Sequence, residues 1–232
     1  MSQLHMLADD ATRAVGWGTK AIQLARGLGD REAEMHALNN VGTVLLVTGE
    51  AAEGRARLTQ SLDLALAGDA HEHAARAYTN LGSSCVLNRS FGQADRYLQA
   101  GITYCADRDL ETWRLYMIAW RARLLAERGQ YAAADRCLAE VMRHPHVAPI
   151  TRVSALPVAG VLAARRGDGD GGAAALDEGI ALAVRTGEAQ RLGPVAAARR
   201  GSVDRRAPVR RRRRRRPRLG RRPGPSASVG TG

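Results

Sequence analysis

Aromatic residues are scarce in this sequence: Phe, Trp and Tyr make up 4% of the 232 residues, although 45% of the residues are hydrophobic. A core built by this chain must therefore consist largely of Ala, Leu and Val. Such small aliphatic side chains favour helices that pack closely, and signals typical of strands are lacking. We therefore predict an all-α fold.

The sequence also lacks long apolar runs and paired cysteines. No apolar segment approaches the roughly 18–20 residues that span a bilayer, and the N-terminus has no signal-peptide pattern, so we predict a cytoplasmic protein without membrane contact. The three cysteines, Cys85, Cys105 and Cys137, form no CxxC pair, which argues against a disulfide framework or a zinc site. We expect them to behave as small buried hydrophobic residues.

Patterns that bind cofactors or metals are incomplete. The single lysine, Lys20, lies in AVGWGTKA, which lacks the glycines that a phosphate-binding loop requires. The segment GDGDGG at 167–172 matches GxGxxG, but it follows a predicted helix at a turn, where a flexible loop is expected. The two HxH clusters, at 71–73 and 144–146, fall short of a four-ligand metal set. We therefore predict no cofactor, no metal and no enzymatic activity.

An internal repeat is present instead, with a period of roughly 40 residues, within the range that repeat arrays use. Segment 37–65 aligns with segment 77–105, a third copy at 119–142 keeps the same offset, and a fourth copy is slightly shorter. The aligned columns are Gly42, Gly82, Ala122 and Gly160; Gly49, Arg89, Gly129 and Gly167; Gly54, Ala94, Ala134 and Gly172; and Leu58, Leu98, Leu138 and Leu176. Such self-similarity is typical of repeat proteins.

Each copy is predicted to form a helix pair. The glycine column at 49, 129 and 167 suits left-handed helix ends, and Asp30, Asp69 and Asp109 stand where N-caps would begin the first helices. The two small-residue columns would let paired helices approach closely, and the leucine column would fill the layer between repeats. We therefore predict an α-solenoid over residues 1–198, with repeats near 30–68, 69–108, 109–147 and 148–187 and a half repeat at each end.

This pattern resembles the tetratricopeptide repeat, with Phe91 and Tyr131 in its aromatic position, although the period exceeds the usual ~34 residues. The phrases ALNNVGT, HEHAARAYTNLGSS and TGEAQRLGPVAAAR are similar to the C-terminal helical region of large ATP-binding LuxR-type (MalT-like) transcriptional regulators. The resemblance covers residues 10–198. In such regulators it implies an upstream nucleotide-binding domain, a repeat region that senses or docks partners, and a terminal helix-turn-helix; we expect this chain to supply only the repeat region.

In tetratricopeptide arrays the first helix of each pair lines the concave face, which implies a polar groove for a protein or peptide partner. The candidate contacts are His36, Asn39, Thr43, Arg76, Thr79, Ser83, Tyr116 and Arg123. The alternative is an ordinary solvated face, on which Asn40 and Asn80 only satisfy backbone groups between helices. Exposed terminal repeats also predict self-association.

Basic charge is concentrated at residues 199–232, which hold 14 arginines and one acidic residue, whereas residues 1–198 hold 21 basic and 22 acidic residues. Because this segment is rich in Arg, Pro, Gly and Ser, we predict a disordered tail. Its candidate polyanion contacts are Arg210, Arg211, Arg212, Arg213, Arg214, Arg215 and Arg216. One hypothesis is nonspecific nucleic-acid binding through this tail. The other is that the tail results from a frameshift in GC-rich DNA, which leaves a truncated regulator that ends near Arg199.

Overall fold

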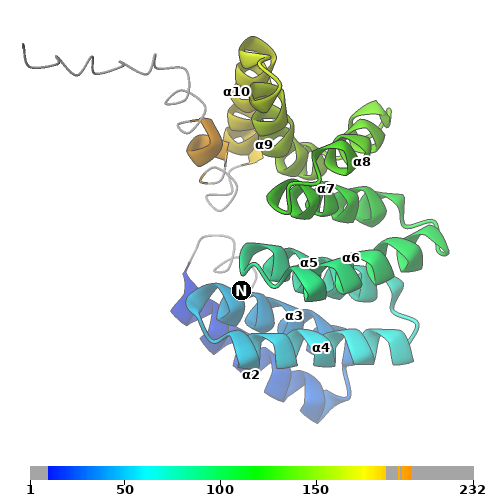
Figure 1. Cartoon of the computed structure of the whole chain (residues 1–232). Coiled ribbons are helices and arrows are strands. Elements are labelled where there is room, and N and C mark those ends of the chain that lie inside the picture. Colours follow the sequence, from blue (N-terminus) through cyan, green and yellow to red (C-terminus); the bar gives the residue numbers. More distant parts are fainter. Residues whose placement is uncertain (1–9, 187–192, 194, 200–232) are drawn as a thin grey trace, which may run out of the picture.

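The computed structural model describes residues 10–186, 193 and 195–199, and every regular element in them is an α-helix (Figure 1). The helices are α2 (Ala11–Leu28), α3 (Arg31–Thr48), α4 (Ala51–Ala67), α5 (His71–Leu87), α6 (Phe91–Ala106), α7 (Glu111–Glu127), α8 (Tyr131–Arg143), α9 (Pro149–Arg165) and α10 (Gly169–Thr186). Residues 195–199 are also helical. The predicted all-α class is therefore confirmed.

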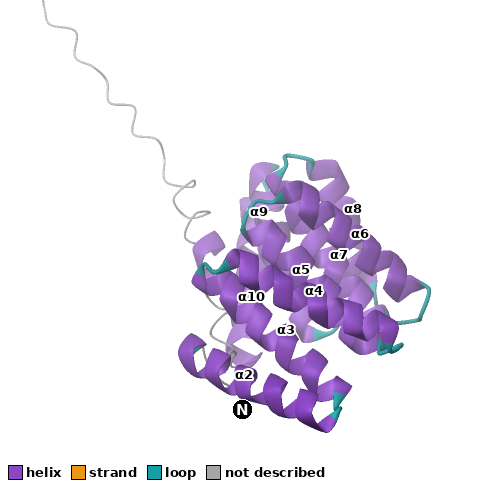
Figure 2. Cartoon of the chain, turned by 90° about the horizontal axis from the view of Figure 1, so that it is seen from below, coloured by secondary structure: helices purple, strands orange, loops and turns teal. Residues whose placement is uncertain are grey.

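The helices pack in the order of the chain, from α2 at the lower end of Figure 1 to α10 at the upper end. Each of them contacts the next one along the sequence, and α3, α5, α7 and α9 also contact one another in succession. Contacts of similar extent are lacking between the even-numbered helices of the described residues. The odd-numbered helices α3, α5, α7 and α9 therefore form a continuous layer of contacting helices. Figure 2 shows the same helices and the short turns that connect them.

Small residues let the two helices of a pair cross at backbone contact. A Cβ atom added to Gly54 of α4 would lie 2.8 Å from the carbonyl oxygen of Gly42 in α3, and one added to Gly42 would lie 2.8 Å from that of Gly54. Gly160 of α9 and Gly172 of α10 face each other in the same way, at 3.0 and 2.8 Å. The predicted close approach of these columns is confirmed in both pairs.

The leucine column lies in the core. Leu58, Leu98 and Leu176 have no exposed surface, and Leu138 is 5% exposed. A Cβ atom on Gly82 of α5 would lie only 2.7 Å from Cδ2 of Leu98, so the small-residue and leucine columns of a pair fit directly together. Leu98 also belongs to a buried cluster with Met117 and Leu124 of α7, which links one pair to the next.

The helix ends confirm part of the turn prediction. Gly49, Gly129 and Gly167 have φ values of 100°, 77° and 87°, in the left-handed region that favours glycine. Asp30 is the N-cap of α3, because its Oδ1 accepts a hydrogen bond from the Ala33 amide at 3.0 Å.

The N-cap prediction is wrong for Asp69 and Asp109. The cap positions are Ala70 before α5 and Leu110 before α7, and neither makes a side-chain cap hydrogen bond. Asp69 and Asp109 instead have positive φ values of 50° and 54°. They lie one repeat and two repeats after Gly29, whose φ is also positive, at 69°. Aspartate tolerates this left-handed conformation better than most residues, so it serves here in the turn rather than as a cap.

Arg89 occupies the left-handed position that glycine fills in the neighbouring repeats, with a φ of 56°. A left-handed conformation costs a non-glycine residue roughly 1–2 kcal/mol, and replacement by glycine removes this cost. Part of the gain is lost again, because glycine loses more backbone entropy on folding. We therefore expect Arg89→Gly to raise the free energy of unfolding by roughly 0.5–1 kcal/mol, measured by urea denaturation. Gly129→Ala, at the equivalent turn, should lower it, and a destabilising Arg89→Gly would contradict this assignment.

The remaining predictions concern the membrane and the tail. Among the helices of the described residues, none is long and apolar enough to cross a bilayer. Arg199, the first residue of the predicted tail, is helical, and its guanidinium pairs with Asp177 at 2.7 Å. Residues 200–232, and with them Arg210–Arg216, lie outside the described residues.

Candidate partner-binding face

The eight residues predicted to contact a partner come from three odd-numbered helices. His36, Asn39 and Thr43 lie on α3; Arg76, Thr79 and Ser83 lie on α5; and Tyr116 and Arg123 lie on α7. Six of them are partly exposed, whereas Asn39 and Thr79 are each only 1% exposed. The prediction that Asn39 and Thr79 contact a partner is therefore wrong, because their side chains are covered by the protein's own fold.

Asn39 and Thr79 hold the layer together instead. Nδ2 of Asn80 donates a hydrogen bond to Oδ1 of Asn39 at 2.5 Å, which links α5 to α3. The Thr79 hydroxyl donates to the carbonyl oxygen of Ala75 within α5 at 2.8 Å. Burial of Oδ1 of Asn39 and of the Thr79 hydroxyl is compatible with stability because both are hydrogen-bonded.

Arg76 is the centre of a polar network between α3 and α5. Its Nη1 lies 2.8 Å from Nδ1 of His36, and its Nη2 donates to Oδ1 of Asn40 at 2.9 Å. Burial lowers the pKa of the Arg76 guanidinium, and within the described residues no carboxylate forms an ion pair with it. A half-buried cation is thus held here by neutral partners.

His36 is kept neutral by the same arrangement. Its pKa is lowered from the usual 6.5 to about 4, first by burial and then by the positive charge of Arg76 and by His73. Because Arg76 can only donate, Nδ1 of His36 must be the acceptor in their contact, which places the imidazole proton on Nε2. His36 therefore serves the network as a neutral acceptor.

This shift predicts a pH dependence of stability. The unfolded chain protonates His36 near pH 6.5 and the folded chain only near pH 4, so protons favour unfolding between these values. We expect the contribution of His36 to be fully present above about pH 6.5 and to be lost as the pH falls through about 4. Urea denaturation across this range should show a flatter profile for His36→Gln than for wild type. His146→Gln, at an exposed site, is the control and should keep the wild-type profile.

Three residues of this face were missed by the sequence analysis. His73 lies one helical turn before Arg76; its ring meets that of His36 edge-on at 6.1 Å between centroids, and its Nε2 lies 3.7 Å from Oε1 of Glu32. Val47 and Leu87 are 70% and 50% exposed at the ends of α3 and α5. Val47 and Leu87 follow Thr43 and Ser83 by four residues and therefore lie on the same face of α3 and α5. Helical periodicity in the sequence could have identified them.

The α7 part of the face is less strongly basic. Arg123 donates to Oε1 of Glu127 at 3.0 Å, and its guanidinium carbon lies 5.5 Å from the ring centroid of Trp120.

Nε1 of Trp120 and Nδ2 of Asn39 are buried and make no hydrogen bond within the described structure. The odd-numbered layer thus combines hydrogen-bond donors, partly buried arginines such as Arg76 and Arg123, and an apolar rim.

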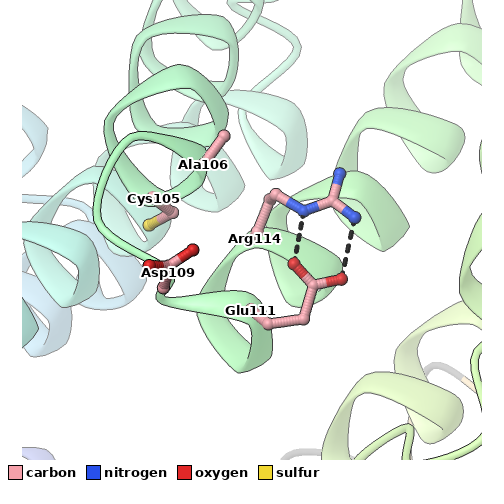
Figure 3. A pocket seen from close by; sticks show the side chains of 5 residues that line it. All are labelled: Cys105, Ala106, Asp109, Glu111 and Arg114. Carbon is pink, nitrogen blue, oxygen red and sulfur yellow. Dashed lines mark hydrogen bonds and ion pairs between the residues drawn. The ribbon is translucent and has the colours of Figure 1, made fainter.

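A shallow depression of about 410 Å³ lies elsewhere, where α6 ends and α7 begins (Figure 3). Arg114 donates to both carboxylate oxygens of Glu111, at 2.6 and 2.8 Å, and to Glu140 at 2.6 Å. Burial raises the pKa of the Cys105 thiol, which also lines the depression, to about 12, so this thiol is neutral and a poor nucleophile. Arg114 is thus already paired with two carboxylates, and we assign no chemistry to this depression.

The other sequence motifs lie in structural positions. His71 is the first residue of α5, with Nδ1 2.9 Å from the Tyr104 hydroxyl, and His144 ends α8. The segment GDGDGG spans a turn and the start of α10, where Asp168 accepts from the Gly171 amide at 2.8 Å. In the described part of the chain, no three His, Cys, Asp or Glu residues lie close enough to hold a metal ion. Cys85 and Cys105 are buried as expected, and Cys137 is half-buried.

Comparison of the chain with models of known protein families gave no match, and no curated protein matched its sequence.

Proposed function

We propose that this chain is a tetratricopeptide-like α-solenoid of four helix pairs, which acts without catalysis as a protein-interaction or sensor module of a LuxR-type transcriptional regulator. The observation that supports the array most strongly is the contact pattern: successive odd-numbered helices contact one another, and successive even-numbered helices do not to a similar extent. Identical small-residue crossings in α3/α4 and α9/α10 add to it.

The contact pattern also indicates where a partner would bind. If the odd-numbered helices are closer together than the even-numbered ones, the stack must curve toward the odd-numbered side, and such a concave surface is what repeat proteins offer to extended partners. On this side α3 and α5 present Arg76 and His36, with Val47 and Leu87 at the rim. The face suits a peptide that carries hydrogen-bond acceptors and at least one apolar side chain.

The regulator assignment rests on the sequence resemblance. The phrases at residues 71–84 and 186–199 are similar to the helical region of LuxR-type regulators, and a sensor region needs a binding surface rather than a reaction centre. We accordingly place the protein in the cytoplasm, where such regulators act.

The experiment compares protein capture by three forms of the chain: wild type, a truncation that ends at Ala198, and the double variant Val47→Glu, Leu87→Glu. The two replaced residues are 70% and 50% exposed, so the fold should tolerate the change, which circular dichroism would check. We expect the truncated chain to retain the partners bound by wild type and the double variant to lose them. Retention by the double variant would contradict the proposal.

The alternative function, nonspecific polyanion binding, is favoured by the 14 arginines at residues 199–232. If it is correct, the truncation abolishes all binding, and binding to any DNA sequence falls with salt at a log–log slope of about −0.9 for each phosphate contact. Nuclease treatment of the captured material separates the two functions, because it removes partners that are held through nucleic acid.

A further inference from the structure

Helix α2 lies at one end of the array (Figure 1). It exposes an apolar stripe. Trp17, Leu24 and Leu28 are 46%, 65% and 73% exposed, and their spacing of seven and four residues places them on one face of the helix. An adjacent face of the helix carries Ala14, Gly18, Ile22 and Ala25, which are buried. Among the described helices, only α3 packs extensively against α2.

The repeat shows what covers the position of Leu24 in the complete pairs. Leu24 occupies the same repeat position as Leu64 in the next copy and Tyr104 in the copy after that. Leu64 of α4 packs against a buried cluster formed mostly by α3, the first helix of its own pair, together with Ile22 of α2. Tyr104 of α6 contacts the first helix of its own pair in the same way, with its hydroxyl 2.9 Å from Nδ1 of His71 and its ring 5.7 Å from that of Tyr78. In a complete pair, the position of Leu24 is therefore covered by an antiparallel helix.

The positive charge of this surface favours a binding helix that carries acidic residues. The sequence of α2 contains no acidic residue, and Lys20 lies between Trp17 and Leu24 with its ammonium 5.1 Å from the Trp17 ring. Within the described residues no carboxylate pairs with Lys20, whereas Arg26 is paired with Glu34 at 2.6 Å. The first helices of three complete pairs begin with acidic residues, Glu32 and Glu34 in α3, Glu72 in α5 and Glu111 in α7, whereas α9 has none in its first turn.

A second copy of α2 does not meet this requirement. Two copies packed antiparallel through this stripe would bring the two Lys20 side chains together, without a carboxylate from either helix to compensate. Like charges placed together in an interface are unfavourable. An acidic helix, in contrast, supplies the opposite charge and an apolar face.

We propose that the stripe of Trp17, Lys20, Leu24 and Leu28 is a docking site for an amphipathic helix of a partner protein, which carries carboxylates in its first two turns and lies antiparallel to α2. This helix-in-groove type of recognition uses apolar anchors spaced along one helical face. The site is separate from the odd-numbered layer, so the proposal stands or falls independently of the proposed function.

The test measures fluorescence anisotropy of a labelled peptide with the sequence of residues 30–48, DREAEMHALNNVGTVLLVT, titrated with the full chain. This probe is the helix that covers the equivalent position in α3/α4 and carries three acidic residues near its start. We expect saturable binding to wild type and a loss of affinity of at least about tenfold for Leu24→Glu. Val184→Glu, at a 62% exposed site on α10, is the matched control and should bind as wild type does.

A charge exchange keeps the test independent of folding. Lys20→Glu should weaken binding of the peptide, and a peptide with Glu32→Lys and Glu34→Lys should bind Lys20→Glu better than it binds wild type. Equal affinity of wild type and Leu24→Glu, or the absence of binding to wild type, would overturn the proposal. A dimer of the chain that Leu24→Glu dissolves, without peptide binding, would assign the stripe to a second copy and would also overturn it.

Discussion

Leu98→Ala is expected to lower the free energy of unfolding by about 2–5 kcal/mol, the usual range for removing a buried leucine. Leu98 has no exposed surface and packs on Gly82 of its own pair and in a cluster with Met117 of the next pair. Loss of its side chain leaves a cavity at the junction of α5, α6 and α7, which rigid neighbours fill only in part. Urea denaturation followed by circular dichroism measures the effect.

The control for this prediction is Leu87→Ala, at a leucine of the same repeat that is 50% exposed. Its replacement should change the free energy of unfolding by less than about 0.5 kcal/mol. Equal effects of the two substitutions would mean that the leucine column does not form the core of the array.

Gly54→Ala is expected to lower the free energy of unfolding by about 1–3 kcal/mol, although alanine is the better helix former. The added Cβ atom would lie 2.8 Å from the Gly42 carbonyl oxygen and 2.8 Å from the Leu46 amide nitrogen, both backbone atoms of α3. Backbone cannot rotate away as a side chain can, so α3 and α4 must move apart and lose contacts along their length.

Gly16→Ala supplies the matched control, because Gly16 lies within α2 and a Cβ atom there meets nothing within 4 Å. It should raise the free energy of unfolding by up to about 1 kcal/mol, the difference in helix propensity between the two residues. The same chemical change is thus predicted to have opposite signs at two helical sites. Stabilisation by both substitutions would contradict the close crossing of α3 and α4.

Much of the fold could be predicted because packing imposes a period on the sequence. The positions of Gly42 and Gly54 hold small residues in every copy, and the position of Leu58 holds leucine, because the two helices of each pair approach each other closely. The failures came at Asp69 and Asp109, where aspartate suits both an N-cap and a left-handed turn. Only the backbone path decides between these two roles, and a single sequence does not contain it.

The candidate face was predictable to a smaller extent. Helical periodicity placed His36 and Arg76 on α3 and α5, and these two side chains form the polar network. It could not show that Asn39 and Thr79 are covered, because burial at the edge of a helical stripe depends on how closely the next helix approaches. Periodicity also gave no reason to separate His73 from the His71 cluster, although the two histidines lie in different environments.

The exposed stripe on α2 shows a second limit of sequence patterns. Leu24 and Leu64 occupy equivalent positions and are identical in type, yet Leu24 is 65% exposed whereas Leu64 packs against α3. Repeat position therefore predicts which surface a side chain would bury, and the neighbouring element decides whether that surface is covered.

The central claim is that the odd-numbered helices lie on the concave side of a curved array. Pulsed electron resonance between two spin labels tests it directly, with one pair at Val47→Cys and Leu87→Cys on α3 and α5, and another at Ala56→Cys and Arg96→Cys on α4 and α6. All four sites are exposed, and the two sites of each pair occupy equivalent positions in neighbouring repeats; the three native cysteines would be replaced by alanine. The account predicts a shorter distance between the labels at 47 and 87 than between those at 56 and 96. Equal distances, or a shorter distance between 56 and 96, would contradict it.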